Sequence, residues 1–362
     1  MQNALPETKD AKEVSVTVTA FMAAELPQEL IELLERIVLH NSEFSSNKQL
    51  QNLLILTAIK SEHSRVMDYI NRLDHYDGVE LAEVAEEDQY RLYDEALCIY
   101  KKAGEHLRAV KVLLTKQSNI KGAQEYAEKT NVAEVWSELG RAYLDQSMLP
   151  EAIDSFIKAD DASSYMAVIN MCGERELWEE LVTFLHMARK SKKERVIDSE
   201  LIFAYASGGD RYLGQLEAFI ADPNQADING VGERCLEAKH WPAAKALFTK
   251  SGNTQKLAQV YVFTKEYVQA YEAAKKADVP KVWKAVAFAC VRAHEFRTAG
   301  LCGVNIIVHP DHLEDVIRHY EKFGYYQELV ALLEQGMRLE RAHNGIYTEL
   351  GIIFAKYMPG KL

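Results

Sequence analysis

Residues 189–195, with the sequence R-K-S-K-K-E-R, hold five basic side chains in seven positions, although the whole chain has a formal net charge of −12. Such a cationic cluster in an acidic protein could bind an acidic partner helix, and its charge would govern orientation and association rate more than affinity. The alternative is a solvated turn, because cations near the carboxyl end of a helix interact favourably with its dipole. The residues alone leave both interpretations open.

A second group, His309-Pro310-Asp311-His312 with Cys302 nearby, contains residue types that bind metal ions. Its spacing matches no standard zinc pattern and no second ligand pair accompanies it, so we expect no metal site. Because proline interrupts a helix, the motif predicts a turn in which Asp311 caps the helix that follows. No serine, cysteine or carboxylate pair is framed as a nucleophile or an acid–base couple, so we expect neither catalytic residues nor a cofactor.

The five cysteines are odd in number, scattered and mostly placed among apolar residues, and none forms a C-x-x-C motif (Cys98, Cys172, Cys235, Cys290 and Cys302). We therefore expect reduced, buried thiols in a cytosolic protein. The amino terminus has no apolar signal core, and no apolar run approaches the roughly 18 residues of a membrane span. The acidic balance argues against a nucleic-acid-binding protein, which needs basic surface facing the phosphates.

Helices must position these residues, and the clearest helical pattern lies within residues 148–166. Pro150 is tolerated in a first helical turn, and one face of the segment is apolar (Leu149, Ala152, Ile153, Phe156 and Ile157). Such a helix cannot bury its apolar face alone. The sequence therefore predicts neighbouring helices of the same kind.

The same pattern recurs along the chain: a large residue is followed three positions later by Ala or Leu, and often seven positions later by another large residue. The groups are Tyr93/Ala96/Tyr100, Ile120/Ala123, Leu149/Ala152/Phe156, Trp178/Leu181/Leu185, Leu213/Leu216/Ile220, Trp241/Ala244/Phe248, Tyr267/Ala270, Phe296/Ala299 and Tyr326/Leu329/Leu333. The period is about 29 residues, within the range of roughly 20–50 that marks a solenoid, and it accommodates a helix–turn–helix unit.

We therefore predict an all-α fold, a right-handed α-solenoid (superhelix) of stacked short helical hairpins. In this interpretation the large residue fills the space within a hairpin, and the small residue lets the next helix approach closely. One segment departs from the pattern, because Val14, Val16 and Val18 alternate as in a strand. Their period predicts a short β-strand ahead of a helix that opens at Pro27.

Six segments of the sequence resemble the clathrin heavy-chain family. They are residues 4–22 (A-L-P-E-T-K-D-A-K-E-V-S-V-T-V-T-A-F-M), 50–60 (L-Q-N-L-L-I-L-T-A-I-K), 151–166 (E-A-I-D-S-F-I-K-A-D-D-A-S-S-Y-M), 178–190 (W-E-E-L-V-T-F-L-H-M-A-R-K), 288–291 (F-A-C-V) and 339–350 (L-E-R-A-H-N-G-I-Y-T-E-L). Such runs, in order across the whole chain, are far more specific than a short motif.

The resemblance is to the proximal leg and knee side of the triskelion leg. It implies one clathrin heavy-chain repeat unit over residues 1–140, a second over residues 141–288 and part of a third over residues 289–362. It also implies a fragment without the amino-terminal propeller and the carboxy-terminal trimerisation hub. The loop at residues 206–212, which contains Gly208-Gly209, is a slightly long departure from the family pattern.

The resemblance further implies a structural coat protein rather than an enzyme. Its partners would be other heavy chains in the lattice of coated pits and vesicles, on their cytoplasmic face, and an acidic clathrin light chain, with membranes contacted only through adaptors. Carried over residue by residue, the light-chain contacts fall at Lys190 or Lys193, and near Lys284 beside Trp283, which fits a core position equally. The alternatives are a helical-repeat subunit of a vacuolar-sorting or tethering complex and, from another class, an enzyme with its site at a hairpin junction.

Overall fold

The computed structural model describes residues 11–40 and 43–358, and helices are the only regular elements among them. The chain divides into two compact units, residues 1–171 and 172–362, and the division falls within α11 (Tyr165–Arg175). The all-α helical-repeat fold predicted from the sequence is confirmed. The handedness of the superhelix stays a prediction.

The first unit contains ten helices before α11 and one π-helical segment, η2, among its described residues. They are α1 (Ala11–Ala23), α2 (Pro27–His40), α3 (Lys48–Ser61), α4 (His63–Arg72), α5 (Gly78–Glu86), α6 (Tyr93–Ala103), α7 (His106–Lys111), η2 (Val112–Lys116), α8 (Ile120–Thr130), α9 (Ala133–Asp145) and α10 (Leu149–Ala159).

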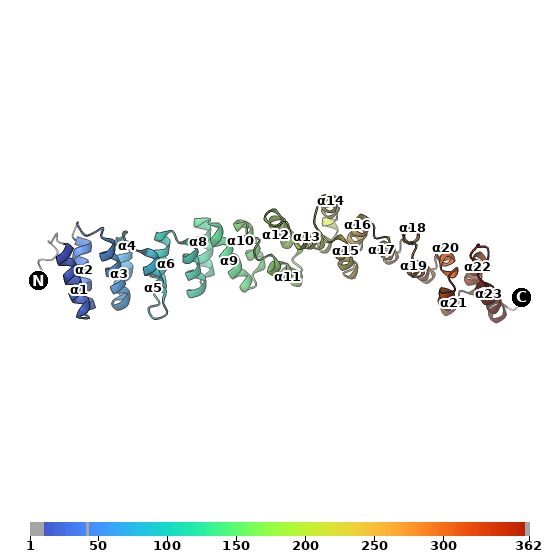
Figure 1. The fold of residues 1–362 in the computed structure, drawn as a ribbon, viewed down its shortest axis with the longest axis horizontal. Helices are drawn as coiled ribbons and strands as arrows, with labels where there is room; N and C mark the ends of the chain where they lie inside the picture. Colours follow the sequence, from blue (N-terminus) through green and yellow to red (C-terminus); the bar gives the residue numbers. More distant parts are fainter. Residues whose placement is uncertain (1–10, 41–42, 359–362) are drawn as a thin grey trace. The chain divides into compact units, whose positions relative to one another are not determined.

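The second unit continues the series of short helices. They are α12 (Trp178–Ser191), α13 (Arg195–Ser207), the 3-10 turn η3 (Asp210–Tyr212), α14 (Leu213–Ala221), α15 (Ile228–Glu237), α16 (Trp241–Ser251), α17 (Thr254–Phe263), α18 (Tyr267–Ala277), α19 (Pro280–Arg292), α20 (Phe296–Ile307), α21 (Pro310–Phe323), α22 (Tyr326–Met337) and α23 (Asn344–Tyr357). In each unit, most helices pair with the next in sequence, as α9 does with α10 and α15 with α16, and each pair lies beside the following pair (Figure 1).

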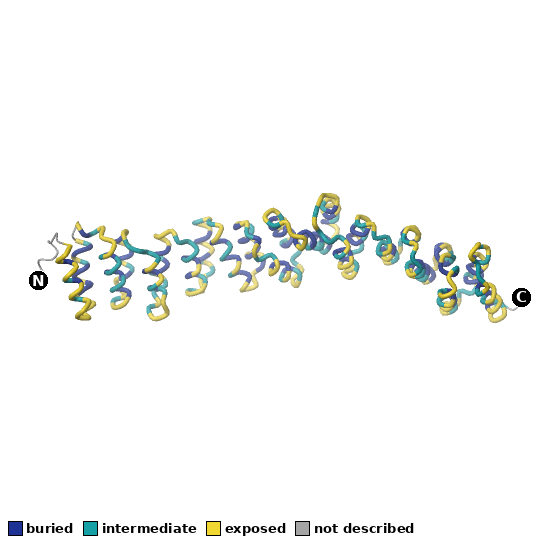
Figure 2. Tube along the Cα trace, viewed as in Figure 1, coloured by how far each residue is buried: buried dark blue, intermediate teal, exposed yellow. Residues whose placement is uncertain are grey.

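The sequence repeat coincides with the helices. All nine large residues that open the repeats are the first residues of the even-numbered helices from α6 to α22. The residue three positions later is at most 2% exposed in every repeat, whereas the opening residue itself is half-buried in all but one, Leu149. The large residue that fills the hairpin is therefore the one seven positions along, as with Tyr100, Phe156 and Phe248, rather than the first. Figure 2 shows the buried positions where helices face one another.

Close approach of the two helices in a hairpin depends on small residues opposite large ones. Gly140 on α9 faces Phe156 on α10, and Gly232 on α15 faces Phe248 on α16 in the same way. An ideal Cβ would lie 2.9 Å from the phenylalanine ring at Gly140 and 2.8 Å from it at Gly232. Neither helix pair could keep its spacing with a larger residue there, because both rings are fully buried.

The predicted strand near the amino terminus is wrong, because Val14, Val16 and Val18 lie in α1. Val14 and Val18 are four residues apart, one helical turn, and both are buried, whereas Val16 is 70% exposed. Alternate valines therefore satisfy a helix as well as a strand. The apolar and alanine-rich residues that follow continue the helix.

The predicted cap at residues 309–312 is also wrong in detail. Pro310 does not interrupt a helix but begins α21. Proline is tolerated there because the backbone amides of a first helical turn have no acceptor within the helix. The N-cap residue is His309, and Asp311 lies in the first turn, where its charge complements the helix dipole. Of the five cysteines, all unpaired, four are buried as expected and Cys98 is half-buried.

The slightly long loop after α13 is built around two glycines. Gly209 has a φ of +85°, which favours glycine, and an ideal Cβ on Gly208 would lie 2.5 Å from the ring of Tyr212. The chain then makes the turn η3 and enters α14. This connection brings α14 against α16.

Replacing Gly232 by alanine is expected to lower the free energy of unfolding by about 1–3 kcal/mol, because the added methyl group overpacks the contact with the buried Phe248. Gly173→Ala is the matched control on α11: no atom lies within 4 Å of its ideal Cβ, so alanine should stabilise by about 0.5–1 kcal/mol. Urea unfolding followed by circular dichroism measures both. Equal stability of the two variants would contradict close packing of α15 on α16.

Candidate protein-interaction surface

The two arginines of the basic segment 189–195 are held by carboxylates of the chain itself. Arg189 Nε, near the end of α12, donates to Asp198 Oδ1 at 2.7 Å, and its guanidinium lies 4.7 Å from the centre of the Phe219 ring. Arg195 begins α13 and pairs with Asp227 Oδ2 at 3.0 Å. Both arginines therefore act within the fold, tying α12 and α13 to residues further along the chain.

The loop between α14 and α15 completes this arrangement. Asp198 is 6% exposed, and its Oδ2 accepts a hydrogen bond from the Gln225 amide at 2.8 Å. The neighbouring Ser199 Oγ accepts from the Asp227 amide at 3.0 Å. A hollow of about 360 Å³ remains at the surface, lined by Arg189, Lys193, Asp198, Pro223, Asn224 and Gln225. The loop is thus fixed beside Lys193.

Lys190 and Lys193 remain as the outward cations of the segment. Both side chains are exposed, and neither makes an ion pair within residues 11–40 and 43–358. Lys190 lies in the last turn of α12, where the helix dipole favours a cation. One turn earlier, burial and then the charges of Arg189 and Lys190 lower the pKa of His186, whose Nε2 lies 2.7 Å from the Tyr205 hydroxyl. Positive charge therefore concentrates at this end of α12.

The other two predicted contact residues lie on α19. Trp283 is only 3% exposed, its indole Nε1 donates to Asp278 Oδ1 at 3.3 Å, and its ring packs against Tyr271. This is the core placement that the sequence left open. Lys284 is partly exposed and bonds to Asp315 on α21, and this hydrogen bond and charge lower the pKa of the Asp315 carboxyl.

The structure does not bring the two pairs of predicted residues together. Lys190 lies in the last turn of α12 and Lys193 just after that helix, which packs on α13. Trp283 and Lys284 lie on α19, which packs on α17, α18, α20 and α21. A partner that contacts both pairs must extend over several hairpins, because no single pocket in the described part of the chain contains all four residues.

The sequence analysis missed the lysines in the last turns of six even-numbered helices, although α14, α20 and α22 have no basic residue there. In the first unit these are Lys101 of α6, Lys129 of α8 and Lys158 of α10; in the second they are Lys190 of α12, Lys250 of α16 and Lys276 of α18. Consecutive helices of a hairpin run in opposite directions, so the even-numbered helices of a unit end at the same edge. Aligning the charges with the 29-residue repeat would have revealed these lysines.

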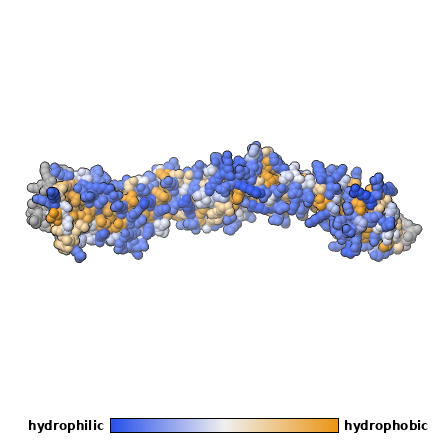
Figure 3. Space-filling view, in the orientation of Figure 1, coloured by the Kyte–Doolittle hydropathy of each residue, from blue (hydrophilic) through white to orange (hydrophobic). Residues whose placement is uncertain are grey.

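Some of these lysines already contact side chains of the chain itself. Lys158 pairs with Asp154 at 2.7 Å and lies 4.4 Å from the centre of the Trp136 ring, and Lys101 lies 5.1 Å from that of Tyr126. Figure 3 shows hydrophilic residues over most of the visible face, with hydrophobic residues between them. The lysines at these helix ends therefore lie beside aromatic and apolar side chains.

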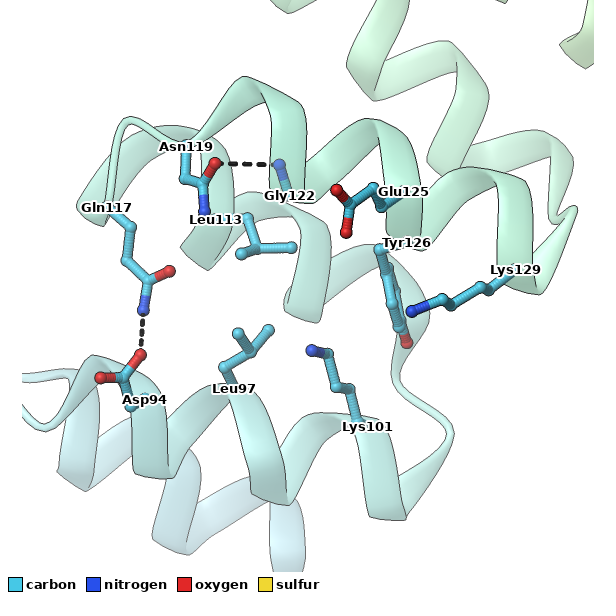
Figure 4. A pocket seen from close by; sticks show the side chains of 10 residues that line it. All are labelled: Asp94, Leu97, Lys101, Leu113, Gln117, Asn119, Gly122, Glu125, Tyr126 and Lys129. Atoms are coloured by element: carbon cyan, nitrogen blue, oxygen red, sulfur yellow. Dashed lines mark hydrogen bonds between the residues drawn. The ribbon is translucent and has the colours of Figure 1, made fainter.

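Lys101 and Lys129, at the ends of α6 and α8, line a hollow of about 500 Å³ between α6, η2 and α8 (Figure 4). Leu97 and Leu113 face one another across it, and Lys101 and Lys129 both point toward Tyr126. Gln117 Nε2 donates to Asp94 Oδ1 at 2.7 Å on the opposite side. Two lysines are balanced there by Asp94 and Glu125, so the hollow has no net charge with which to select an ion.

Two further properties concern the whole described part of the chain. Within residues 11–40 and 43–358, no group of three or more His, Cys, Asp or Glu side chains could hold a metal ion. The same residues include no helix that is long and apolar enough to cross a membrane.

Comparison with known proteins shows one family along the chain. The family model for clathrin, described as a region in clathrin and VPS, matches residues 5–149, 156–298 and 304–362. The chain is 51% identical over 362 residues to the clathrin heavy chain of Dictyostelium discoideum, 49% to that of Drosophila melanogaster and 46% to clathrin heavy chain 2 of Homo sapiens. Each match covers 100% of this chain and 21–22% of the relative, so the chain spans about one fifth of their length.

Replacing Asp198 by alanine is expected to lower the free energy of unfolding by about 2–4 kcal/mol, because Arg189 and the Gln225 amide both lose their acceptor. Asp154→Ala is the control, since its pair with Lys158 is exposed and worth less than about 1 kcal/mol. Urea unfolding measures the loss, and hydrogen exchange should rise at residues 222–227 in the Asp198 variant only. Similar losses in both variants would contradict a structural role of the loop.

Proposed function

The chain belongs to the clathrin family, and from this membership we propose that it is a leg segment of a clathrin heavy chain, a structural coat protein. The observation that carries the proposal is the match of the whole chain to heavy chains at 46–51% identity. In this role the segment would present binding surface to other proteins at defined intervals along the leg. The proposal assigns it no catalytic role.

The repeat units of the leg are proposed as residues 1–140, 141–288 and 289–362. The support is the period of the sequence, whose hairpins continue through these ranges. Hydrophobic contacts between neighbouring hairpins would make each unit a continuation of the last. The surface, rather than an enclosed site, would then carry the function.

Partners of the segment are proposed to be an acidic clathrin light chain and other heavy chains of the lattice. Lys190 and Lys193 are exposed cations without an internal ion pair in the described residues, and Lys284 is a partly exposed cation that Asp315 holds in place. An acidic helix could contact either group through charge and apolar anchors. Trp283 would contribute by supporting α19 from within, because its side chain is buried.

Assembly into the coat is proposed to occur through many weak contacts between legs, on the cytoplasmic face of coated pits and vesicles, with adaptors between coat and membrane. Each contact can remain individually reversible because the contacts of one leg act together. The lysines at the ends of α8, α10 and α16 fit this role, since they place positive charge at more than one point along the chain.

A subunit of a vacuolar-sorting or tethering complex is the alternative, because the matching family model covers both clathrin and VPS proteins. The full-length identity to heavy chains favours the coat protein. A pull-down with a recombinant light chain separates the two, since the coat segment should bind it and a sorting subunit should not.

The double variant Lys190→Glu/Lys193→Glu is expected to bind a recombinant clathrin light chain about tenfold more weakly, mainly through slower association, because charge steers the encounter. The matched control is Lys60→Glu/Lys121→Glu, which changes the net charge equally at exposed lysines of the first unit. Surface-plasmon resonance at two salt concentrations measures the light-chain affinity of both double variants. Raising the salt concentration should reduce the difference in affinity between Lys190→Glu/Lys193→Glu and the unchanged chain, because salt screens the charges. Equal binding by both double variants would contradict a contact at the end of α12.

A further inference from the structure

The basic segment 189–195 contains one hydroxyl group, that of Ser191, to which the proposed function gives no role. Ser191 is the last residue of α12 and is exposed, and the three residues that follow it belong to no regular element. Its hydroxyl donates to the Ala188 carbonyl oxygen at 3.1 Å, within the last turn of the helix. Ser191 therefore lies at the surface, where α12 ends in a short irregular connection to α13.

Ser191 differs in charge from the other serines at the ends of helices. Four described helices end in a serine, and Ser61 of α3 matches Ser191 best, because it is exposed and its hydroxyl also donates to a carbonyl oxygen of its own helix, that of Thr57 at 2.7 Å. Lys60 precedes Ser61 and Glu62 follows it, so the charges beside Ser61 cancel. Ser191 instead has two cations before it and two after it. The remaining two helix-ending serines, Ser207 and Ser251, are half-buried.

An exposed serine among cations suits a protein kinase that selects basic substrates. Such a kinase recognises its substrate by the pattern of charge around the hydroxyl, through acidic groups of its own. The substrate segment must also leave its helix to enter the active site. Residues 192–194 are already outside a helix, and the last turn of a helix opens at low free-energy cost. Charge, exposure and position at a helix end therefore all favour Ser191 as a phosphate acceptor.

The surroundings of Ser191 also offer a place for the phosphate. The hollow of about 360 Å³ beside the segment is lined by Arg189 and Lys193, each two residues from Ser191 along the chain. Asp198 lines it too, but Arg189 pairs with Asp198 at 2.7 Å, so these two charges cancel and Lys193 leaves the hollow with a net positive charge. A phosphate on Ser191 adds about −1.5 to −2 charges and three acceptor oxygens, which Lys193 can bind.

We propose that Ser191 is phosphorylated by a serine/threonine kinase that selects basic substrates, and that the phosphate offsets the outward charge of Lys190 and Lys193. In the transfer, Ser191 Oγ forms a bond to the γ-phosphorus of ATP, and the bond from that phosphorus to the bridging oxygen breaks. ADP leaves, and the hydroxyl proton passes to the catalytic base of the kinase. The modification stands on the segment alone. Its effect on an acidic partner rests on the proposed function, since these two lysines are the proposed contacts.

The modification is tested on the folded full chain with ATP and the catalytic domain of protein kinase C, whose substrates carry basic residues around the serine. We expect mass spectrometry to find phosphate on Ser191, with at least tenfold less on Ser61, because the kinase discriminates by charge. Ser191→Ala should lower the incorporation at least tenfold, and Ser61→Ala should leave it unchanged. Equal incorporation into Ser191→Ala and the unchanged chain would overturn the site. So would phosphorylation of a synthetic peptide of residues 186–197 without phosphorylation of the folded chain.

The effect of the phosphate is tested with the recombinant light chain. The phosphorylated chain is expected to bind it about tenfold more weakly than the unmodified chain, mainly through slower association, and phosphatase treatment should restore binding. Ser191→Ala treated with kinase and ATP is the matched control and should bind as the unmodified chain does. If the phosphorylated chain binds equally well while Lys190→Glu/Lys193→Glu binds more weakly, the regulatory effect is overturned and the light-chain role stands. If no light chain binds the unmodified chain, the proposed function and the regulatory effect both fail, and the incorporation alone decides the phosphorylation site.

Discussion

Contact between a small residue on one helix and a buried ring on the next sets the spacing of two hairpins in this chain, α9–α10 and α15–α16. At Gly140 and Gly232 the facing phenylalanine comes so close that an added Cβ would lie less than 3 Å from its ring. Each such contact joins helices that are adjacent in sequence, so the core forms from neighbours. The chain then needs no element far along the sequence to close a core, and each hairpin keeps exposed side chains on its outer faces.

The fold could be predicted because this constraint repeats. A buried residue three positions into every even-numbered helix, from Ala96 to Leu329, gives a period that periodicity analysis detects directly. The prediction failed where a local pattern fits two structures. Val14, Val16 and Val18 alternate as a strand does, yet Val14 and Val18 also share one helix face, and the residues that follow decide in favour of the helix. Pro310 is likewise compatible with the end or with the start of a helix, and only the residues around it show that it starts one.

The candidate surface was less predictable, because its residues act through partners that lie far along the chain. The segment 189–195 shows five cations, but Asp198 and Asp227 engage two of them, and Asp227 belongs to a loop more than thirty residues beyond Arg189. Which lysines remain outward therefore depends on tertiary contacts. Trp283 shows the same difficulty, since a tryptophan beside a lysine suits an interface or a core until its burial is known.

A helical-repeat protein can leave a gap between two helices of one layer at little cost, because its stability comes from contacts with nearest neighbours. In the second unit α17 packs on α16, α18 and α19, so a hollow between α16 and α18 does not interrupt the succession of hairpins. A compact domain would lose core packing at such a gap, and substitution would tend to fill it. Here the gap can persist with apolar walls, because the contacts of α17 with α16, α18 and α19 keep the succession of hairpins intact.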